Sequence, residues 1–305
     1  MTTRTIHAVH RNDQFHWVGD GFYVNQLLPT GPELAHLTEP FLLMDYNPVK
    51  EYPPTDVPRG VGVHPHRGFE TVTLAFEGAV AHHDSTGAGG VIYPGDVQWM
   101  TAARGILHKE YHEAEWAKVG GRFHMVQLWV NLPAKHKMDE PGYQGLTAES
   151  MGKVKLEGGG VVTLVAGELD GEVGPARTFT PIELWDAELV ADETAELAVP
   201  DGHNLMVFVI DGEVTSGDGH VNGAHQGAGA GRGGVRLAQQ ELGIFNREGS
   251  VLRLTAGPLG ARVLVLGGEP INEPVLFHGP FVMNTREEII AAYEDFRRGK
   301  FGHLE

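Results

Sequence analysis

Residues 64–78 read HPHRGFETVTLAFEG and carry the most specific pattern in this 305-residue chain. The segment begins with His64-Pro65-His66, in which one residue separates two histidines. Side chains at positions i and i+2 of a β-strand point to the same face, so both imidazoles are aimed at one point. Pro65 restricts such a strand to an edge or to a lightly hydrogen-bonded position. A strand with this pattern can supply two ligands of a metal site.

A second pair with the same spacing is His108-Lys109-Glu110, which follows turn residues at 103–105. Two facing strands that each present two ligands would form a site of three imidazoles and one carboxylate. Such a site suits a divalent Fe, Mn, Co, Ni, Cu or Zn ion. The chain has 17 histidines, so pairs of this kind also arise by chance. From these residues alone, a metal site and ordinary structural or surface roles remain equally open.

The segments around these pairs read as short strands separated by turns, which is typical of a β-sandwich or barrel. We predict strands at 62–66, 70–76, 91–97 and 122–132, and turns at 77–78, 84–90, 94–96 and 104–105. Glycine is abundant, at 42 residues without a regular repeat, which agrees with many tight turns. The first half of the chain therefore reads as all-β.

The second half shows the same pattern of short strands and turns. It follows a polar segment at about 135–160, which is the best candidate for a domain boundary. We predict strands at 161–166, 176–180, 182–187, 205–210 and 263–266. The similar sequences FEGAV at 76–80 and IDGEV at 210–214 are weak evidence for an internal duplication. The second half has no His-x-His pair, so we expect domain 1–140 to bind the metal and domain 141–305 to be metal-free.

Two further segments have clear local patterns. Residues 286–298 have an apolar stripe, and Thr285 and Glu288 have the spacing of a capping box, so we predict a helix there. Residues 217–234 are rich in glycine and formally contain G-x-G-x-x-G. A dinucleotide site needs a strand before this motif and a helix after it, and neither is indicated, so we expect a surface loop.

The bulk composition excludes several classes of function. The net charge is −17, from 23 basic and 40 acidic side chains, so a phosphate backbone or an anionic membrane should repel the protein. A basic protein partner remains compatible with this charge. The absence of cysteine excludes disulfides and thiolate ligands. No signal peptide or long apolar run is visible, so we expect a soluble, cytoplasmic protein.

Beyond the first motif, the chain contains PGDVQWMTAARGILHKE at 94–110, LWVNLP at 128–133 and LFHGPFVMNTREEIIAAYEDFRRGKFG at 276–302. Together these segments resemble the pirin version of the cupin fold, whereas residues 140–270 match only in style. The resemblance implies two tandem cupin β-barrels, a bicupin, with a short C-terminal α-helix. It also implies one metal ion, usually iron, held in the first barrel by His64, His66, His108 and Glu110.

The same resemblance implies an activity similar to quercetin 2,3-dioxygenase, which opens a flavonol ring with O₂. The expected ligands are then a small aromatic substrate, O₂ and one divalent metal, most simply Fe(II). Glu110 would act as the general base for a substrate hydroxyl. An alternative within the family is a regulatory protein-binding module that uses the metal as a redox or structural element. A non-oxidative cupin, such as a sugar isomerase, is a third interpretation.

Glu70 is in tension with this assignment. In the general cupin pattern the carboxylate ligand follows the His pair by four residues, which is the position of Glu70. Strand periodicity from His66 would place Glu70 on the same face unless Gly68 bends the chain. We favour Glu110 on the pirin pattern. Weaker candidates for the site are histidines 82, 83, 112 and 124. We interpret Phe69 and Trp129 as core residues rather than as residues that contact a substrate.

Overall fold

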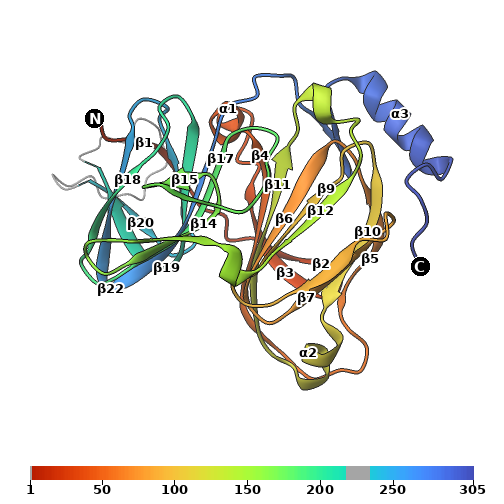
Figure 1. Ribbon diagram of the computed structural model, residues 1–305, viewed down its shortest axis with the longest axis horizontal. Coiled ribbons are helices and arrows are strands. Elements are labelled where there is room, and N and C mark those ends of the chain that lie inside the picture. The colour runs from red at the N-terminus through yellow and green to blue at the C-terminus, as the bar shows by residue number, and fades with distance from the viewer. Residues whose placement is uncertain (1, 218–233) are drawn as a thin grey trace. The chain divides into compact units, whose positions relative to one another are not determined.

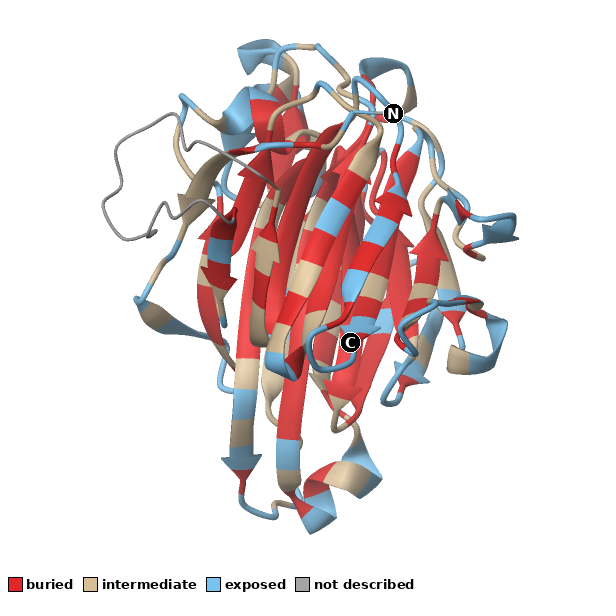
Figure 2. Cartoon of the chain, turned by 90° about the vertical axis from the view of Figure 1, so that its left-hand side faces the viewer, coloured by how far each residue is buried: buried red, intermediate tan, exposed pale blue. Residues whose placement is uncertain are grey.

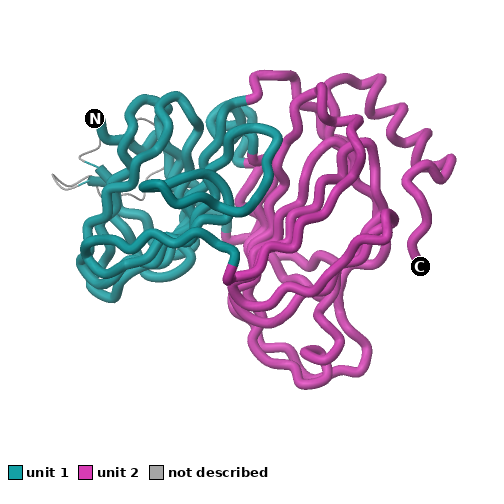
Figure 3. The backbone as a smooth tube through the Cα atoms, in the orientation of Figure 1, with its two compact units in different colours: residues 1–12, 30–40, 150–270 teal, residues 13–29, 41–149, 271–305 magenta. Residues whose placement is uncertain are grey.

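The computed structural model describes residues 2–217 and 234–305, and the described residues form a mainly β-structure with a few short helices (Figure 1). The chain divides into two compact units (Figure 3). Unit 1 contains residues 1–12, 30–40 and 150–270, and unit 2 contains residues 13–29, 41–149 and 271–305. The all-β prediction is confirmed.

This division differs from a simple split near residue 140. The first strand, β1 (Ile6–His10), pairs with β21 (Leu242–Phe245) and so belongs to unit 1. The terminal helix α3 (Arg286–Arg297) belongs to unit 2, together with the metal-ligand candidates. It joins unit 2 because Leu107 packs against the apolar cluster that contains its buried residues Ile289 and Ala292, and because Arg67 forms an ion pair of 3.0 Å with Asp295 on the helix.

Unit 2 contains two antiparallel sheets. The larger has the order β12 (Gly142–Leu146), β9 (Val97–Thr101), β6 (Phe69–Glu77), β11 (Gly121–Asn131), β4 (Phe41–Tyr52), β3 (Phe22–Leu28) and β2 (Phe15–Val18). The smaller has the order β5 (Gly60–His66), β10 (Ile106–His112), β7 (Val80–Asp84) and β8 (Gly89–Ile92). Unit 2 also includes the helix α2 (Ala114–Val119), the 3₁₀ turn η1 (Ala134–His136) and the ladder of β23 (Leu276–His278) with β24 (Phe281–Met283). The 3₁₀ turn η2 (Ala148–Ser150) lies at a boundary, because Ser150 begins the third segment of unit 1.

Unit 1 is built on one antiparallel sheet. Its order is β1, β21, β19 (Asn204–Ser216), β22 (Val251–Gly268), β17 (Ile182–Leu189), β14 (Val161–Ala166) and β13 (Gly152–Lys155), with β18 (Thr194–Ala198) on β22 and β20 (Val235–Ala238) on β19. The short helix α1 (Ala35–Thr38) and the two-residue strands β15 (Glu168–Leu169) and β16 (Glu172–Val173) complete the unit. Its core is mainly aliphatic around Trp185.

Buried residues run along the strands, and exposed residues gather in the loops and at strand ends (Figure 2). The predicted strand at 122–132 is confirmed as β11, and the predicted terminal helix is confirmed, capping box included. The predicted strand at 91–97 is wrong because a turn at Tyr93–Asp96 separates β8 from β9. Gly95 has φ +91° in this turn, and the amide of Asp96 donates to Tyr93 O.

Two other predictions of local structure are wrong. Residues 176–180 form no strand, and residues 142–146 of the predicted linker form β12 by pairing with β9. Most of the glycine-rich segment predicted as a loop lies outside the described residues, at 218–233. Within the described ranges, no helix has the length and apolar character needed to cross a membrane.

Candidate metal centre

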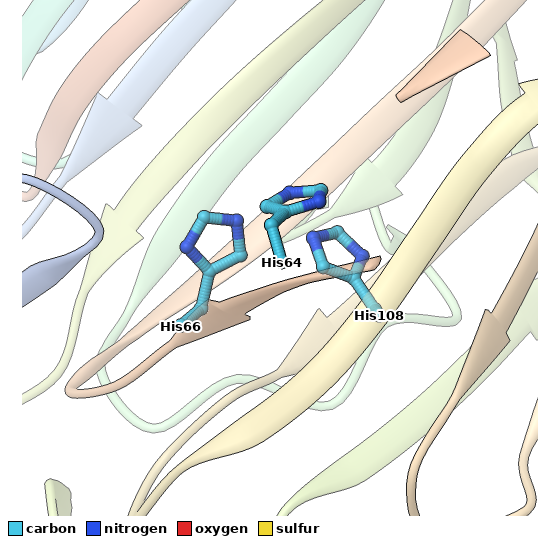
Figure 4. Close-up of side chains that lie close together, drawn as sticks. All are labelled: His64, His66 and His108. Carbon is cyan, nitrogen blue, oxygen red and sulfur yellow. The ribbon is translucent and has the colours of Figure 1, made fainter. Parts of the chain in front are cut away.

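Three histidines converge on the inner side of the smaller sheet of unit 2. His64 and His66 lie on β5, and His108 lies directly opposite His64 on the neighbouring strand β10. The ring centroid of His64 lies 4.2 Å from that of His108, and the centroid of His66 lies 4.8 Å from both. The nitrogen atoms that could bind an ion lie within 4.8 Å of one another, and Figure 4 shows the three rings facing a common point. The two-residue spacing of the histidines on β5 is what aims their side chains to the same face.

Burial keeps two of these imidazoles in the form that binds metals. Desolvation, reinforced by neighbouring histidines, lowers the pKa of His66 and of His108 well below the ordinary value of 6.5. Neutral imidazole carries a lone pair for coordination, whereas imidazolium does not. These two side chains are therefore ready to bind a cation at neutral pH.

Hydrogen bonds orient the histidine rings on β5. His64 Nδ1 lies 2.8 Å from Gly62 O, and His66 Nδ1 lies 3.3 Å from Pro280 O. A ring whose Nδ1–H donates to a carbonyl carries its lone pair on Nε2. His108 shows the complementary feature, because its buried Nε2 has no hydrogen-bond partner among the described residues. A buried polar atom without a partner is costly, and a bound ion would supply the missing interaction.

Glu110 projects from β10 two residues after His108, and a shift in register separates the two in the ladder with β5. Its carboxylate forms a second group of close ligand atoms with His82 and His108. Glu110 Oε2 accepts a hydrogen bond of 2.8 Å from Gln127 Nε2. Glu110 Oε1 accepts one from Gln98 Nε2 and a longer one of 3.3 Å from Thr73 Oγ1. Both oxygens are thus held in place by neutral donors.

These donors come from one row across the larger sheet. Thr73 on β6 is paired in register with Gln98 on β9 and with Gln127 on β11. Directly paired residues of antiparallel strands point to the same side, so the row faces Glu110 on the opposing sheet. The hydrogen bonds to Glu110 therefore join the two sheets of unit 2 through a polar interior.

Glu70 points to the other face of the larger sheet. It is paired with Thr101 and Val130, three residues along each strand from the row that reaches Glu110. An odd number of residues along a strand reverses the face to which a side chain points. Gly68, with φ +90°, breaks the strand between His66 and Glu70, so the periodicity of β5 does not continue into β6. The carboxyl of Glu70 is almost fully buried and accepts a hydrogen bond of 2.7 Å from Thr101 Oγ1. Burial raises the pKa of Glu70 to about 7.

His82 and Asp84 were not singled out by the sequence as a pair, yet they lie next to His108. On β7, His82 is in register with Glu110, and Asp84 is in register with His108. His82 Nε2 lies 3.2 Å from Asp84 Oδ2, and both side chains are completely buried. Burial alone would raise the pKa of Asp84, but hydrogen bonds from His82 and Thr86 lower it. The available signal was the spacing His-x-Asp, the same i, i+2 pattern as in the two recognised pairs.

The remaining histidine candidates lie away from this cluster. His83 is exposed on the other face of β7, where its Nδ1 contacts the Tyr111 hydroxyl at 3.0 Å. His112 lies further along β10, with Nε2 2.9 Å from Gly21 O. The ring of His124 packs against Tyr46 and Phe76.

Aromatic side chains border the histidines. Phe69 and Trp129 are stacked with ring centroids 4.1 Å apart, and each contacts the His66 ring. Tyr143 stacks on His82 at 5.0 Å. Phe69 is fully buried, as predicted, whereas Trp129 and Tyr143 are partly buried. Together these rings give the surroundings of the candidate site flat apolar walls suited to an aromatic ligand.

Two family models match the chain. The model described as Pirin matches residues 21–130, and the model described as Pirin C-terminal cupin domain matches residues 184–302. The first match spans all of the candidate ligands, and the second includes the strands β18 to β22 of unit 1.

Individual proteins agree with these matches. The chain is 44% identical over 299 residues to "Putative quercetin 2,3-dioxygenase PA2418" from Pseudomonas aeruginosa, covering 98% of each sequence. The crystal structure of quercetin 2,3-dioxygenase from Acinetobacter baumannii is similar over the full length of both chains, with a TM-score of 0.89 and 43% identity. The bacterial pirin YhhW from Escherichia coli, solved in complex with nickel(II), shares the fold at 19% identity, with a TM-score of 0.59 over 86% of this chain and 98% of YhhW.

Proposed function

Because the chain belongs to the pirin family of two-cupin proteins, we propose that it is a metal-dependent dioxygenase that opens a flavonol-like substrate with O₂. The observation that carries the proposal is the convergence of three imidazoles on one point beside a fixed carboxylate. Similarity over the whole chain to proteins named as quercetin 2,3-dioxygenases supports the reaction class.

The proposed ligands are His64, His66, His108 and Glu110. The two groups of close ligand atoms share His108, which links Glu110 to His64 and His66 in one cluster. Three nitrogen ligands and one oxygen ligand suit Fe(II), and also Mn, Co, Ni, Cu or Zn. When bound, the ion would lower the pKa of a substrate hydroxyl and orient substrate and O₂.

Glu110 is the proposed catalytic base. Its carboxylate lies in the same buried cluster as His108, which is where a metal-bound substrate hydroxyl would lose its proton. The amides of Gln98 and Gln127 hold both carboxylate oxygens from the opposing sheet. A base held in one orientation is within reach of its proton without reorganisation.

The aromatic surroundings support a flat phenolic substrate. Trp129 and Phe69 stack beside His66, and Tyr143 lies on the other side of the cluster against His82. Burial raises the pKa of the Tyr143 hydroxyl to about 12, so this group stays neutral and can act as a hydrogen-bond donor. These walls would exclude water from the bound substrate.

The test is metal analysis of protein purified without a histidine tag, followed by incubation with quercetin under air. We expect about one metal ion per chain, because the two groups of close ligand atoms among the described residues share His108. The loaded protein should consume quercetin and O₂ in equal amounts, and protein stripped with a chelator should consume neither. A loaded protein that leaves quercetin and related flavonols unchanged would refute the dioxygenase and favour the regulatory interpretation.

A further inference from the structure

We propose that Asp84 and His82 fix the tautomer of His108 and thereby keep its Nε2 lone pair available to the metal. In this arrangement His82 and Asp84 are positioning residues that act through His108. The inference deepens the metal centre of the proposed function and rests on His108 being a ligand.

The three side chains form a continuous buried series. Asp84 Oδ2 lies 3.2 Å from His82 Nε2, and His82 Nδ1 lies 3.4 Å from His108 Nδ1. All three are shielded from water, with exposed fractions of 3%, 0% and 0%. Buried groups of this kind must satisfy one another, because no solvent can do so.

With both imidazoles neutral, the count of hydrogens along the series gives one self-consistent arrangement in the metal-free protein. Asp84 Oδ1 accepts hydrogen bonds from the amides of Thr86 and Ala88 and from the Thr86 hydroxyl. The other oxygen, Oδ2, therefore accepts the hydrogen bond from His82. The carboxylate is an acceptor, so His82 carries its hydrogen on Nε2 and a lone pair on Nδ1. The facing Nδ1 of His108 must then carry a hydrogen.

A neutral His108 with its hydrogen on Nδ1 has its lone pair on Nε2. This nitrogen is the buried atom that lacks a partner among the described residues. One nitrogen of the His108 ring points toward His64 and His66 in Figure 4. A carboxylate that reaches a metal ligand through an imidazole would thus orient the ligand and raise its basicity.

The same atoms permit a rival arrangement. His82, His108 and Glu110 are close enough to hold an ion of their own. In that case His108 Nδ1 would bind a metal and carry no hydrogen, and His82 would be a ligand. The two arrangements predict different metal counts and different tautomers, so they can be separated by experiment.

The decisive variant is Asp84→Asn. The asparagine can keep its oxygen toward Thr86 and Ala88, which preserves the turn, but it presents an amide donor to His82 Nε2. His82 would then carry its hydrogen on Nδ1 and donate to His108 Nδ1, so the hydrogen of His108 would move to Nε2. We expect Co(II), measured by competition with a chelator, to bind roughly 10- to 100-fold more weakly, the usual effect of losing such a partner.

Two variants at position 82 and one neighbouring control test the role of positioning. His82→Asn retains an oxygen close to the position of Nδ1 and should restore most of the Co(II) affinity that His82→Leu loses. His83→Asn removes an imidazole from the same strand but from its exposed face, and it should bind Co(II) as the wild type does. The ligand-field spectrum of bound Co(II) should change in Asp84→Asn and in His82→Leu only.

The tautomers can also be measured directly in metal-free protein by ¹⁵N NMR of the histidine side chains. We expect the hydrogen of His108 on Nδ1 in the wild type and on Nε2 in Asp84→Asn. Wild-type affinity in Asp84→Asn, a His108 that carries its hydrogen on Nε2 in the wild type, or two Co(II) ions per chain would each overturn the proposal. Absence of flavonol turnover with these metal results intact would refute the dioxygenase and leave the positioning role standing.

Discussion

Units 1 and 2 are both antiparallel β-structures, but they bury different kinds of side chain. The core of unit 1 is formed by aliphatic residues on its long central strands, such as Val207 and Val265. The interior of unit 2 contains a row of amide and hydroxyl groups opposite a cluster of histidines and a carboxylate. The fold is shared, and the chemistry depends on which residues occupy the inward positions.

The two kinds of interior contribute differently to the stability of the folded protein. Aliphatic side chains inside unit 1 contribute stability directly, since each buried methylene group is worth about 0.8 kcal/mol. The polar interior of unit 2 contributes only when every group has a partner, because an unpaired buried polar group costs about 1–3 kcal/mol. Unit 2 has polar groups in place of part of an apolar core, and one of them, His108 Nε2, has no hydrogen-bond partner among the described residues.

The strongest test of this contrast is removal of an imidazole from unit 2. In His108→Ala or His66→Ala, metal content should fall from about one ion per chain to less than roughly a tenth, because the variant loses a proposed ligand outright, and loss of a ligand's hydrogen-bond partner alone typically weakens binding about 10- to 100-fold. The apolar core is unchanged, so the circular dichroism spectrum should stay that of a β-protein. Loss of the β spectrum in either variant would instead make the metal a structural element.

The next largest effect should come from the carboxylate. Glu110→Gln should keep part of its metal, since three imidazoles remain, and lose turnover by roughly 10²-fold, the typical contribution of a positioned base. The measurement is the rate of quercetin consumption at matched metal occupancy. Full activity in Glu110→Gln would exclude Glu110 as the base and reopen the assignment.

These two predictions concern residues that the sequence placed in the site, and strand geometry explains why it could. The spacing of His64 and His66 fixes their common face within one strand, so no other part of the chain is needed. The orientation of Glu70 depends on the break at Gly68, which separates two strands of different sheets. Local periodicity therefore indicated the wrong face for Glu70. The spacing of residues made both carboxylates candidates, and only the pirin pattern favoured Glu110 over Glu70.

Other parts of the site depend on pairings between distant segments. His82 lies behind His108 because β7 pairs with β10 in one particular register. Pro280 O lies within hydrogen-bond distance of the His66 ring because residues 271–305 belong to unit 2. From the sequence we expected this C-terminal segment to belong to the second domain. Such long-range contacts have no signature in the spacing of residues along one strand.

Glu70 offers a prediction about stability. Its pKa is raised by burial from 4.5 to about 7, so the folded state holds a proton that the unfolded state has released between these pH values. The free energy of unfolding of the wild type should therefore fall as pH rises from 4.5 to 7. Ionisation of Glu70 should cause no further fall above pH 7. Glu70→Gln imitates the protonated form and avoids this loss.

The expected gain for Glu70→Gln is on the order of 3 kcal/mol at pH 8, from about 2.5 pKa units at 1.36 kcal/mol each, and it should vanish near pH 4. Urea unfolding of both proteins across this pH range would measure it. The metal content of Glu70→Gln should equal that of the wild type, which is the matched control for Glu110→Gln. A Glu70→Gln protein that loses its metal would contradict the placement of Glu70 on the opposite face.

The smallest effect is expected in unit 1, where His203 Nδ1 lies 3.0 Å from Glu183 Oε2. This pair has the same two residue types as the site in unit 2, but within the described ranges no third ligand atom completes a metal-binding group around it. His203→Gln should therefore leave metal content and turnover unchanged. Its cost should be one hydrogen bond, about 1 kcal/mol in urea unfolding. A fall in metal content in this variant would show that residue types alone, without convergence on one point, suffice for binding, and the contrast between the units would lose its basis.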